Sequence, residues 1–209
     1  MYQKIIDKIE NVRASNNVNW MNILRIAMKN NPIETVKVIS KIYESDSDIS
    51  NLVKLLKNFN SIKKILDIRL YKDEDLLDIL EWRNEKVTRK FSKNTKIINK
   101  KQHSTWIKNF LSNKDNQLYL VTLNETKVGM IRIDSIKNKN YLISINFNPI
   151  YRGLGLSKLS LIKVLKFQKN KKLIADIHKD NFISENVFLS CGFKKSKKLD
   201  DKFNRYIKK

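Results

Sequence analysis

A short segment in the C-terminal half of the chain combines residue types that can bind an anion. The chain has only four glycines and two prolines, and the hexapeptide Arg152-Gly153-Leu154-Gly155-Leu156-Ser157 holds two of the glycines shortly after Pro149. Glycines so placed mark a backbone path that side chains would obstruct. If a helix follows, its free N–H groups and the positive end of its dipole converge on one point. Such a loop suits a phosphate or pyrophosphate group.

The segments on either side of this loop predict the elements that hold it. Tyr141–Phe147 alternates as a strand does, and Lys158–Lys169 has the apolar spacing of a helix. Strand-glycine-helix turns are also plain connections in α/β proteins, so the glycine pair leaves both a phosphate site and a structural turn open. The loop lacks the Gly-Lys-Ser/Thr of a nucleoside triphosphate site and the third glycine of a dinucleotide fold, which excludes those two readings.

The segment after the helix narrows the choice. Leu173–His178 has the pattern of a half-buried strand, and Asn181–Cys191 that of a helix ended by Gly192 at its C′ position. The joint pattern, Arg-x-x-Gly-x-Ser followed by Asn-x-x-Ser and Gly-Phe, resembles the GNAT superfamily of acyl-coenzyme A-dependent N-acetyltransferases. It is far more specific than either half.

The resemblance covers roughly Ile65 to Ile207 and implies an α/β (α+β) fold. We expect a GNAT-like mixed, mostly antiparallel central sheet flanked by helices. Asp73 is predicted to cap a helix that runs through Trp82, and a second helix is predicted at Lys100–Leu111. The other strands are predicted at Ile65–Leu70, Gln117–Leu123, Lys127–Asp134, about Lys194–Lys198 and about Phe203–Ile207, with the turn of a hairpin at Asn124-Glu125-Thr126.

The first part of the chain has a different pattern. We predict a small all-α N-terminal module over residues 1–60 and a GNAT-like domain over 61–209. Pro32 predicts the start of a helix that ends near Tyr43, and Ser45–Asp48 predicts the cap of another. So short a module makes a thin core, so it is a candidate to pack on the second domain or to form a homo-oligomer or partner contact. Its apolar stripes are Ile5, Ile6, Ile9 and Val12, and then Trp20, Ile23, Leu24, Ala27 and Met28.

Composition indicates an intracellular globular protein. The 209 residues are 41% hydrophobic, which is ordinary for such a protein. The single cysteine, Cys191, cannot form an internal disulfide. No apolar run approaches the ~18 residues of a membrane span, and Met1–Glu10 lacks a signal-peptide core. We therefore expect a cytoplasmic protein with no membrane partner and no metal.

A formal net charge of +22 raises the question of nucleic acid. Lysine supplies most of the positive charge, whereas arginine, the better reader of phosphates and bases, is sparse. The charge is also spread along the chain instead of forming one block with interleaved aromatics. The pattern therefore argues against a nucleic-acid partner and favours a basic surface that attracts small anions.

The resemblance implies acetyl-CoA as the acyl donor. Backbone N–H groups of two parted strands would hold the acyl carbonyl and pantetheine arm, and the glycine loop would hold the pyrophosphate. Arg152 is a further candidate contact, with a solvated loop residue as the alternative. Asn181 and Ser184 would bond the coenzyme arm; the alternatives are a helix N-cap for Asn181 and an ordinary polar residue for Ser184. The residues so assigned are Ile145, Asn146, Phe147, Arg152, Gly153, Leu154, Gly155, Leu156, Ser157, Asn181, Ser184 and Phe188.

Two departures from the family pattern concern catalysis. Ser157 stands where the family usually has glycine or alanine. Phe188 stands where many relatives carry a tyrosine that protonates the departing thiolate, and phenylalanine cannot donate a proton. The catalytic residues stay unassigned, because each weak candidate also has a structural reading and a water chain can serve instead. These candidates are His178, His103, Tyr151 and Glu185.

A second set of residues bears on the acceptor. Trp82, Arg83 and Asn84, followed by Val87 and Arg89 and later by His103 and Trp106, look like the branch of ribosomal-protein alanine acetyltransferases and nucleotide-amino-sugar (pseudaminic acid pathway) acetyltransferases. Of the two substrate classes, the resemblance slightly favours the 4-amino group of a UDP-linked amino sugar. The alternatives are a protein N-terminal acetyltransferase and, in another class, a non-catalytic CoA-binding or scaffolding module. For Trp82 and Trp106, packing in the core is the competing reading.

Overall fold

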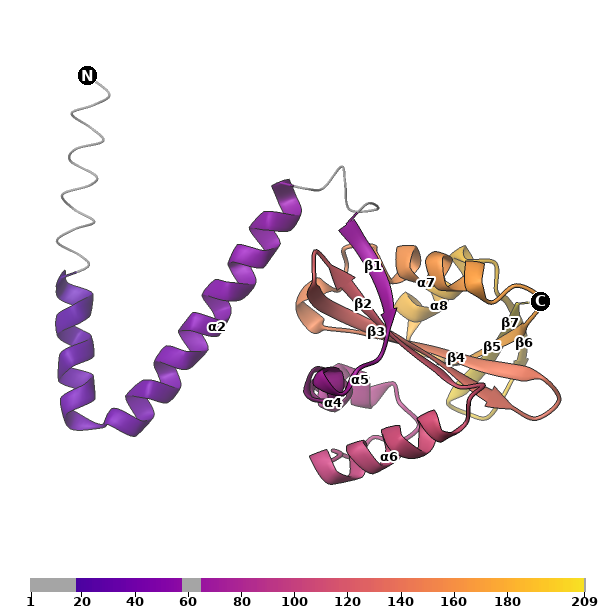
Figure 1. Ribbon diagram of the computed structural model, residues 1–209, viewed down its shortest axis with the longest axis horizontal. Helices are drawn as coiled ribbons and strands as arrows, with labels where there is room; N and C mark the ends of the chain where they lie inside the picture. Colours follow the sequence, from indigo (N-terminus) through magenta and orange to yellow (C-terminus); the bar gives the residue numbers. More distant parts are fainter. Residues whose placement is uncertain (1–17, 58–64, 209) are drawn as a thin grey trace, which may run out of the picture. The chain divides into compact units, whose positions relative to one another are not determined.

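The computed structural model describes residues 18–57 and 65–208, and the chain divides into two units, Met1–Phe59 and Asn60–Lys209. In the first unit, residues 18–30 are helical and α2 runs over Pro32–Lys57 (Figure 1). The predicted start at Pro32 is confirmed, and the Asn31 side chain accepts a hydrogen bond from the Glu34 N–H (3.2 Å). No helix among the described residues is long and apolar enough to cross a bilayer.

The predicted division of this helix was wrong. α2 is one helix of 26 residues that passes through Ser45–Asp48. Serine and aspartate are weak helix formers, but each costs well under ~1 kcal/mol in a helix interior. Without a proline or glycine, four such residues do not end a helix. The predicted stripe Ile5, Ile6, Ile9 and Val12 lies outside the described residues.

The second unit is built on one seven-stranded sheet in the order β1-β2-β3-β4-β5-β7-β6. Neighbouring strands are antiparallel except β4 and β5, which are parallel. The predicted mixed, mostly antiparallel fold is therefore confirmed. The strands are β1 Leu66–Leu70, β2 Gln117–Leu123, β3 Thr126–Ile136, β4 Asn140–Phe147, β5 Lys172–His178, β6 Lys194–Lys198 and β7 Phe203–Lys208.

Helices cover both faces of this sheet (Figure 1). One face carries α4 (Leu76–Asn84), α5 (Lys86–Lys90) and α6 (Lys100–Ser112), and the other carries α7 (Leu156–Phe167) and α8 (Phe182–Ser190). Short 3-10 turns η2 (Asp73–Asp75) and η3 (Pro149–Tyr151) precede α4 and follow β4. The ligand sites considered below therefore lie on a rigid layered frame.

Apolar residues at helical spacing fix α4 and α6 on their face of the sheet. α4 buries Ile79 and Trp82, and α6 buries Ile107 and Phe110. These side chains form one cluster with Leu118, Leu120 and Met130 of β2 and β3. The burial of each such side chain stabilises the fold by about 1.5–3 kcal/mol.

The start of α4 differs from the prediction. Asp73 does not cap the helix but opens η2, and α4 begins at Leu76, after the fully buried Asp75. The Asp75 carboxylate accepts two hydrogen bonds from Arg69 (2.7 and 2.8 Å) and lies 3.0 Å from the Lys127 ammonium. Arg69 at the end of the preceding strand β1 and Lys127 of β3 therefore fix the helix start, and capping signals alone could not reveal these ion pairs.

The hairpin between β2 and β3 is tighter than predicted. Asn124 and Glu125 both have positive φ (45° and 72°), and Leu123 pairs with Thr126. Such a two-residue turn matches the twist of the strands. β3 therefore begins at Thr126, one residue earlier than expected.

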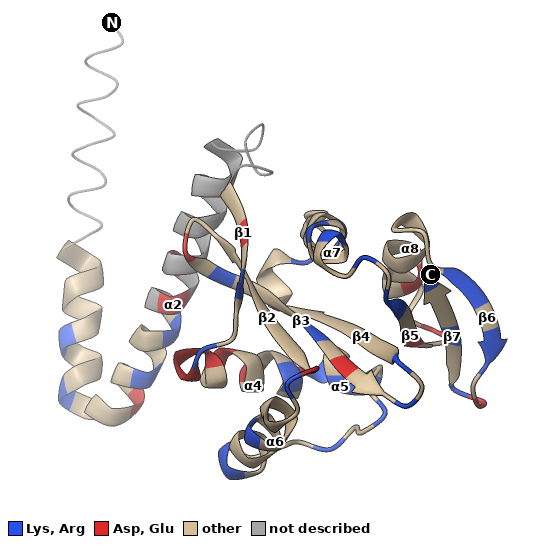
Figure 2. Cartoon of the chain, turned by 45° about the vertical axis from the view of Figure 1, so that its right-hand side comes forward, with Lys and Arg blue, Asp and Glu red and all other residues tan. Residues whose placement is uncertain are grey.

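The positive charge is distributed over several elements (Figure 2). Edge strand β6 is Lys-Lys-Ser-Lys-Lys with every residue exposed, and it stands out as a basic edge. Lysines on an edge strand discourage pairing with another sheet. This role accounts for the lysines of β6 without a bound ligand.

Candidate active site

The two parallel strands separate along their length. β4 and β5 pair at Asn140–Lys172, Tyr141–Leu173 and Leu142–Ile174, and the pairing ends there. Beyond this point β4 stays paired with β3 and β5 with β7. The facing edges of β4 from Ile143 and of β5 from Ala175 therefore lack sheet partners in the described domain. This gap can accept an extended ligand that bonds to backbone groups.

The glycine loop follows the open end of β4. Gly153 and Gly155 have φ of +78° and +73°, in the left-handed region that favours glycine, and Gly155 is the N-cap of α7. A Cβ built on either glycine would meet nothing within 4 Å. Glycine is therefore required for backbone conformation, and the space before the loop is open. α7 begins at Leu156, two residues earlier than predicted, so its first-turn N–H groups adjoin the loop.

Helix α8 starts and ends as the sequence predicts. The Asn181 side chain accepts a hydrogen bond from the Ser184 N–H (3.2 Å), so the N-cap role is present in the structure. At the other end Gly192 has φ of +87°, and the N–H of Phe193 donates to the carbonyl of Phe188 (3.2 Å). These bonds form a Schellman motif. Asn181 thus anchors the helix that lies beside α7 (Figure 1).

The position of the expected tyrosine is part of the core. Phe188 is buried and meets Phe193 edge to face, with ring centroids 5.0 Å apart. The hydroxyl of Tyr206 on β7 donates to the carboxylate of Glu185 on α8. Burial, and then the bond to Glu185, raises the pKa of Tyr206 to about 12. Glu185 is therefore occupied as an acceptor.

Arg152 turns toward the protein. Its guanidinium donates to the Phe147 carbonyl (3.0 Å), the Glu85 carboxylate (3.0 Å) and the Thr88 hydroxyl (2.9 Å). Three bonds to two elements give Arg152 a positioning role, because it ties the glycine loop and the end of β4 to α5. The structure therefore favours this role over the direct pyrophosphate contact expected from the sequence.

Glu85 is the residue that receives this link. It is the N-cap of α5, where its carboxylate accepts from the N–H groups of Val87 and Thr88 (both 2.8 Å). Burial alone would raise the pKa of Glu85, but these bonds and Arg152 lower it to about 2. Glu85 is therefore ionised at neutral pH and stabilises the junction between the two sides of the sheet.

The Trp-Arg-Asn segment mainly holds a loop in place. Trp82 is 2% exposed and lies in the core cluster, so the packing reading holds for it. Asn84 exchanges two hydrogen bonds with the backbone of Ile98 (2.7 and 2.9 Å), and Arg83 donates to the carbonyl of Asn94. The segment between α5 and α6 is thereby fixed on α4.

His103 and Trp106 come together as predicted, on α6. Their rings stack with centroids 5.6 Å apart, and the Arg132 guanidinium carbon lies 5.1 Å from the Trp106 ring centroid. His103 is buried, and burial followed by the charge of Arg83 lowers its pKa. The imidazole is therefore neutral at physiological pH.

The other base candidates are engaged. The His178 Nδ1 accepts from the Asp180 N–H (3.2 Å), and its ring lies against Phe91 and Phe203. Tyr151 is buried in η3, 3% exposed. The four candidates lie on different elements, so the structure does not assemble them into one catalytic group.

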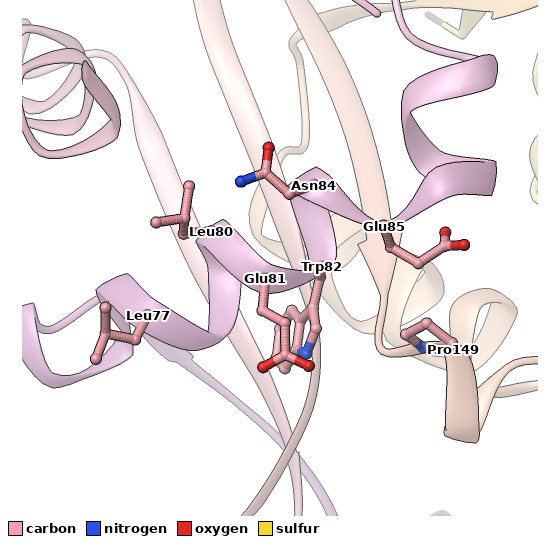
Figure 3. Close-up of a pocket in the computed structure, with 7 residues that line it drawn as sticks. All are labelled: Leu77, Leu80, Glu81, Trp82, Asn84, Glu85 and Pro149. Carbon is pink, nitrogen blue, oxygen red and sulfur yellow. The ribbon is translucent and has the colours of Figure 1, made fainter. Parts of the chain in front are cut away.

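An open groove lies beside α4, with a volume of about 540 Å³ (Figure 3). Glu81 and Trp82 lie on one side of the helix and Asn84 on the other, while Glu85 points toward Pro149 (Figure 3). Of its two carboxylates, that of Glu85 is already paired with Arg152. The groove is lined by Leu77, Leu80, Glu81, Trp82, Asn84, Glu85 and Pro149.

Sequence reasoning missed two charged positions beside the gap. Asp176 of β5 is bonded by Arg205 (2.7 Å) and by Lys93 of the loop after α5 (2.9 Å). Burial would raise the pKa of Asp176, but these bonds lower it. Arg132 is the other. In each case the sequence signal that could have identified the residue is a charged side chain inside an otherwise apolar strand.

Across residues 18–57 and 65–208, no three His, Cys, Asp or Glu side chains could hold a metal ion together.

The geometry defines a mixed-sheet fold with a parted strand pair and a helix-capping glycine loop. Residues 66–194, more than half of the chain, match the acetyltransferase (GNAT) domain family. The chain therefore belongs to the GNAT acetyltransferase family.

Sequence and structure comparisons agree with the assignment. An uncharacterized protein of Methanocaldococcus jannaschii is 29% identical over 161 residues, which are 70% of this chain and 33% of that protein. The chain thus spans about a third of the length of this curated relative. A domain from Methanocaldococcus jannaschii has a crystal structure with a TM-score of 0.62 at 28% identity, covering 68% of this chain and 97% of that one.

A second solved structure shows the same fold. It is the spermidine N-acetyltransferase from Vibrio cholerae in complex with CoA and spermine, with a TM-score of 0.63. The match covers 69% of this chain and 95% of that one at 14% identity. At this identity the likeness concerns the fold alone.

Proposed function

We propose that this protein transfers an acetyl group from acetyl-CoA to a primary amine, most specifically the 4-amino group of a UDP-linked amino sugar. The observation that carries the donor half is the open glycine loop at the start of α7, next to the gap between β4 and β5. The family assignment supports the reaction class. The sugar acceptor rests on the resemblance of the Trp82-Arg83-Asn84 segment, His103 and Trp106.

The coenzyme would use backbone groups before side chains. Its pyrophosphate would lie on the first-turn N–H groups of α7, where Gly153 and Gly155 leave room. The pantetheine arm would enter the gap and bond to the free edges of β4 and β5. Asn181 and Ser184 would contact the arm from the start of α8, with the Asn181 amide nitrogen still available beyond its cap bond.

The reaction requires few side chains. The neutral amine attacks the thioester carbonyl carbon, the carbonyl oxygen becomes an oxyanion, and the C–S bond then breaks to release the thiolate. Backbone N–H groups facing the gap would stabilise the oxyanion. Because Glu185 and His178 accept other bonds, we propose that water takes the amine proton and that water protonates the thiolate.

The test has a donor step and an acceptor step. Calorimetry with acetyl-CoA measures the first, and thiol release across UDP-4-amino sugars and N-terminal peptides measures the second. We expect saturable coenzyme binding and fastest turnover with a UDP-4-amino sugar. Turnover only with peptides would favour a protein N-terminal acetyltransferase. Binding without turnover on any amine would favour a non-catalytic module, and absence of binding would overturn the donor assignment.

A further inference from the structure

A group of cationic side chains gathers on the face of the sheet that carries α4, α5 and α6. It comprises Arg83 of α4, Arg89 of α5 and Arg132 of β3, next to His103 and Trp106 of α6. Burial, and then the charges of Arg132 and Arg89, lowers the pKa of Arg83. The Arg83 guanidinium therefore lies within electrostatic reach of both Arg132 and Arg89. We call these five residues the arginine cluster.

The arginine cluster has too few carboxylates to balance it. Arg132 donates to Asp134 (2.8 Å). Within the part of the chain that the structure describes, neither Arg83 nor Arg89 has a carboxylate partner, and both donate to backbone carbonyls. Like charges close together destabilise a fold unless a counter-charge joins them.

Two polar atoms of the arginine cluster are buried without a partner. They are Nη1 of Arg83 and Nε2 of His103, whose side chain belongs to a residue only 3% exposed. Buried polar groups in native proteins are almost always hydrogen-bonded, so an exception calls for an explanation. Two such atoms on neighbouring side chains of different helices indicate a group that joins them from outside the chain.

Arg132 of the arginine cluster lies one strand away from the gap between the parallel strands. Arg132 pairs directly with Ser144, and Met130 with Asn146, so these side chains share one face of the sheet. Ser144 and Asn146 belong to the part of β4 that has left β5. Thr88 of α5 bonds to Asn146 on this same face (3.2 Å). α7 lies on the opposite face of the sheet (Figure 1), so the arginine cluster is on the face away from the helix that would bind the pyrophosphate.

We propose that Arg83, His103 and Arg132 form a subsite for an anionic oxygen group, a phosphate or a carboxylate, of the acceptor. This inference rests on the proposed transfer to an amine. Guanidinium groups bind such anions through paired, charge-assisted hydrogen bonds, and a neutral imidazole adds one N–H. Trp106 supplies an apolar wall for the rest of the molecule. The subsite selects an amine that carries an anion and disfavours a polyamine.

Anion binding can be measured directly because the chain has only two histidines. Inorganic phosphate is titrated into the protein with coenzyme A at saturation, so that the glycine loop is occupied, while the histidine ring protons are followed by NMR. We expect a saturable shift of the His103 signals and none of the His178 signals, and loss of the shift in Arg132→Gln. No saturable shift of His103 overturns the subsite, whether or not coenzyme A binds.

Kinetics then tests selection. The neutral amine glucosamine, its 6-phosphate, a UDP-4-amino sugar, an amino-acid amide with a side-chain carboxylate, and spermidine are compared by thiol release. In His103→Phe and Arg132→Gln we expect KM for the anionic amines to rise about tenfold or more, with little change for glucosamine and in acetyl-CoA affinity. Comparison of the phosphate and carboxylate amines identifies which anion the subsite prefers.

Matched variants separate the subsite from bulk charge and from folding. His103→Gln keeps an N–H donor and should restore most of the affinity. Lys197→Met removes one charge from exposed strand β6 and should leave every KM unchanged. If KM rises equally for glucosamine and its phosphate, or if Lys197→Met acts like Arg132→Gln, the proposal is wrong.

Discussion

The two faces of the sheet are organised by different kinds of contact. On the face that carries α7 and α8, which we call the donor face because we assign the coenzyme to it, both ends of α8 are held by bonds between residues a few positions apart, such as Asn181 to Ser184. On the face that carries α4, α5 and α6, which we call the acceptor face because we assign the acceptor to it, bonds span tens of residues, such as Lys127 of β3 to Asp78 of α4 and Thr88 of α5 to Asn146 of β4. Local geometry thus builds the donor face, and long-range contacts build the acceptor face.

This contrast predicts that a single substitution in the glycine loop is enough to weaken coenzyme binding strongly. Gly155→Asp should weaken acetyl-CoA binding by about a hundredfold or more, ~2.7 kcal/mol, measured by calorimetry. The variant strains a residue at φ +73° and puts a carboxylate at the anion cradle. Gly192→Asp, at another positive-φ glycine, is the matched control and should lower Tm while affinity stays. Unchanged affinity in Gly155→Asp would mean that the loop is misassigned.

A change at Gly129 of β3, which packs against Phe147 of β4, should lower the stability of the fold. In Gly129→Ala the new Cβ would lie 2.5 Å from the Phe147 ring, so the end of β4 must shift. We expect a loss of about 1–3 kcal/mol in the free energy of unfolding, measured by denaturant titration. Adding Phe147→Leu should recover part of this loss. A double variant no more stable than Gly129→Ala would show that another contact carries the effect.

Breaking the link between the faces should give a pH signature. The pKa of Glu85 is lowered to about 2, so its stabilisation is present above the ordinary carboxyl range near 4.5 and is lost as pH falls from there toward 2. Glu85→Gln should lose about 1 kcal/mol at neutral pH. Thermal unfolding at several pH values should show the wild type and variant converging in acid. A difference that persists at pH 2 would contradict this account.

The smallest effect is expected within the loop itself. Ser157→Ala keeps the backbone N–H that would face the pyrophosphate and changes only a hydroxyl, so acetyl-CoA affinity should change by about twofold or less. Calorimetry on this variant tests whether the glycine loop binds acetyl-CoA through its backbone N–H groups. A large loss of affinity would show that the Ser157 side chain takes part.

The sequence predicted elements well where the signal is local. The helix from Asn181 with Gly192 at its end, strands β5 to β7 and the loop glycines follow from capping, alternation and φ preference, which involve near neighbours. The start of α4 was mispredicted because Asp75 is held by Arg69 and Lys127. The helix boundary predicted at Ser45–Asp48 was wrong because weak helix formers do not end a helix.

The candidate site shows the same division. The sequence identified Arg152 as a charge near a phosphate loop, but its partners Glu85 and Thr88 are more than sixty residues away. His103 and Trp106 are one helical turn apart and were expected together, whereas the approach of Arg132 depends on which β3 residues face α6. Such approaches depend on register and side-chain direction, which spacing along one chain does not specify.

The sequence by itself determined the fold class and the position of the glycine loop, because glycine conformations, caps and alternation are local properties of the chain. Only the tertiary structure decided that Arg152 braces the loop, that Phe188 packs in the core, and that Arg83, His103 and Arg132 gather on the face of the sheet that carries α4, α5 and α6. The physical reason is that charge balance and burial depend on which distant residues meet, and folding alone brings them together.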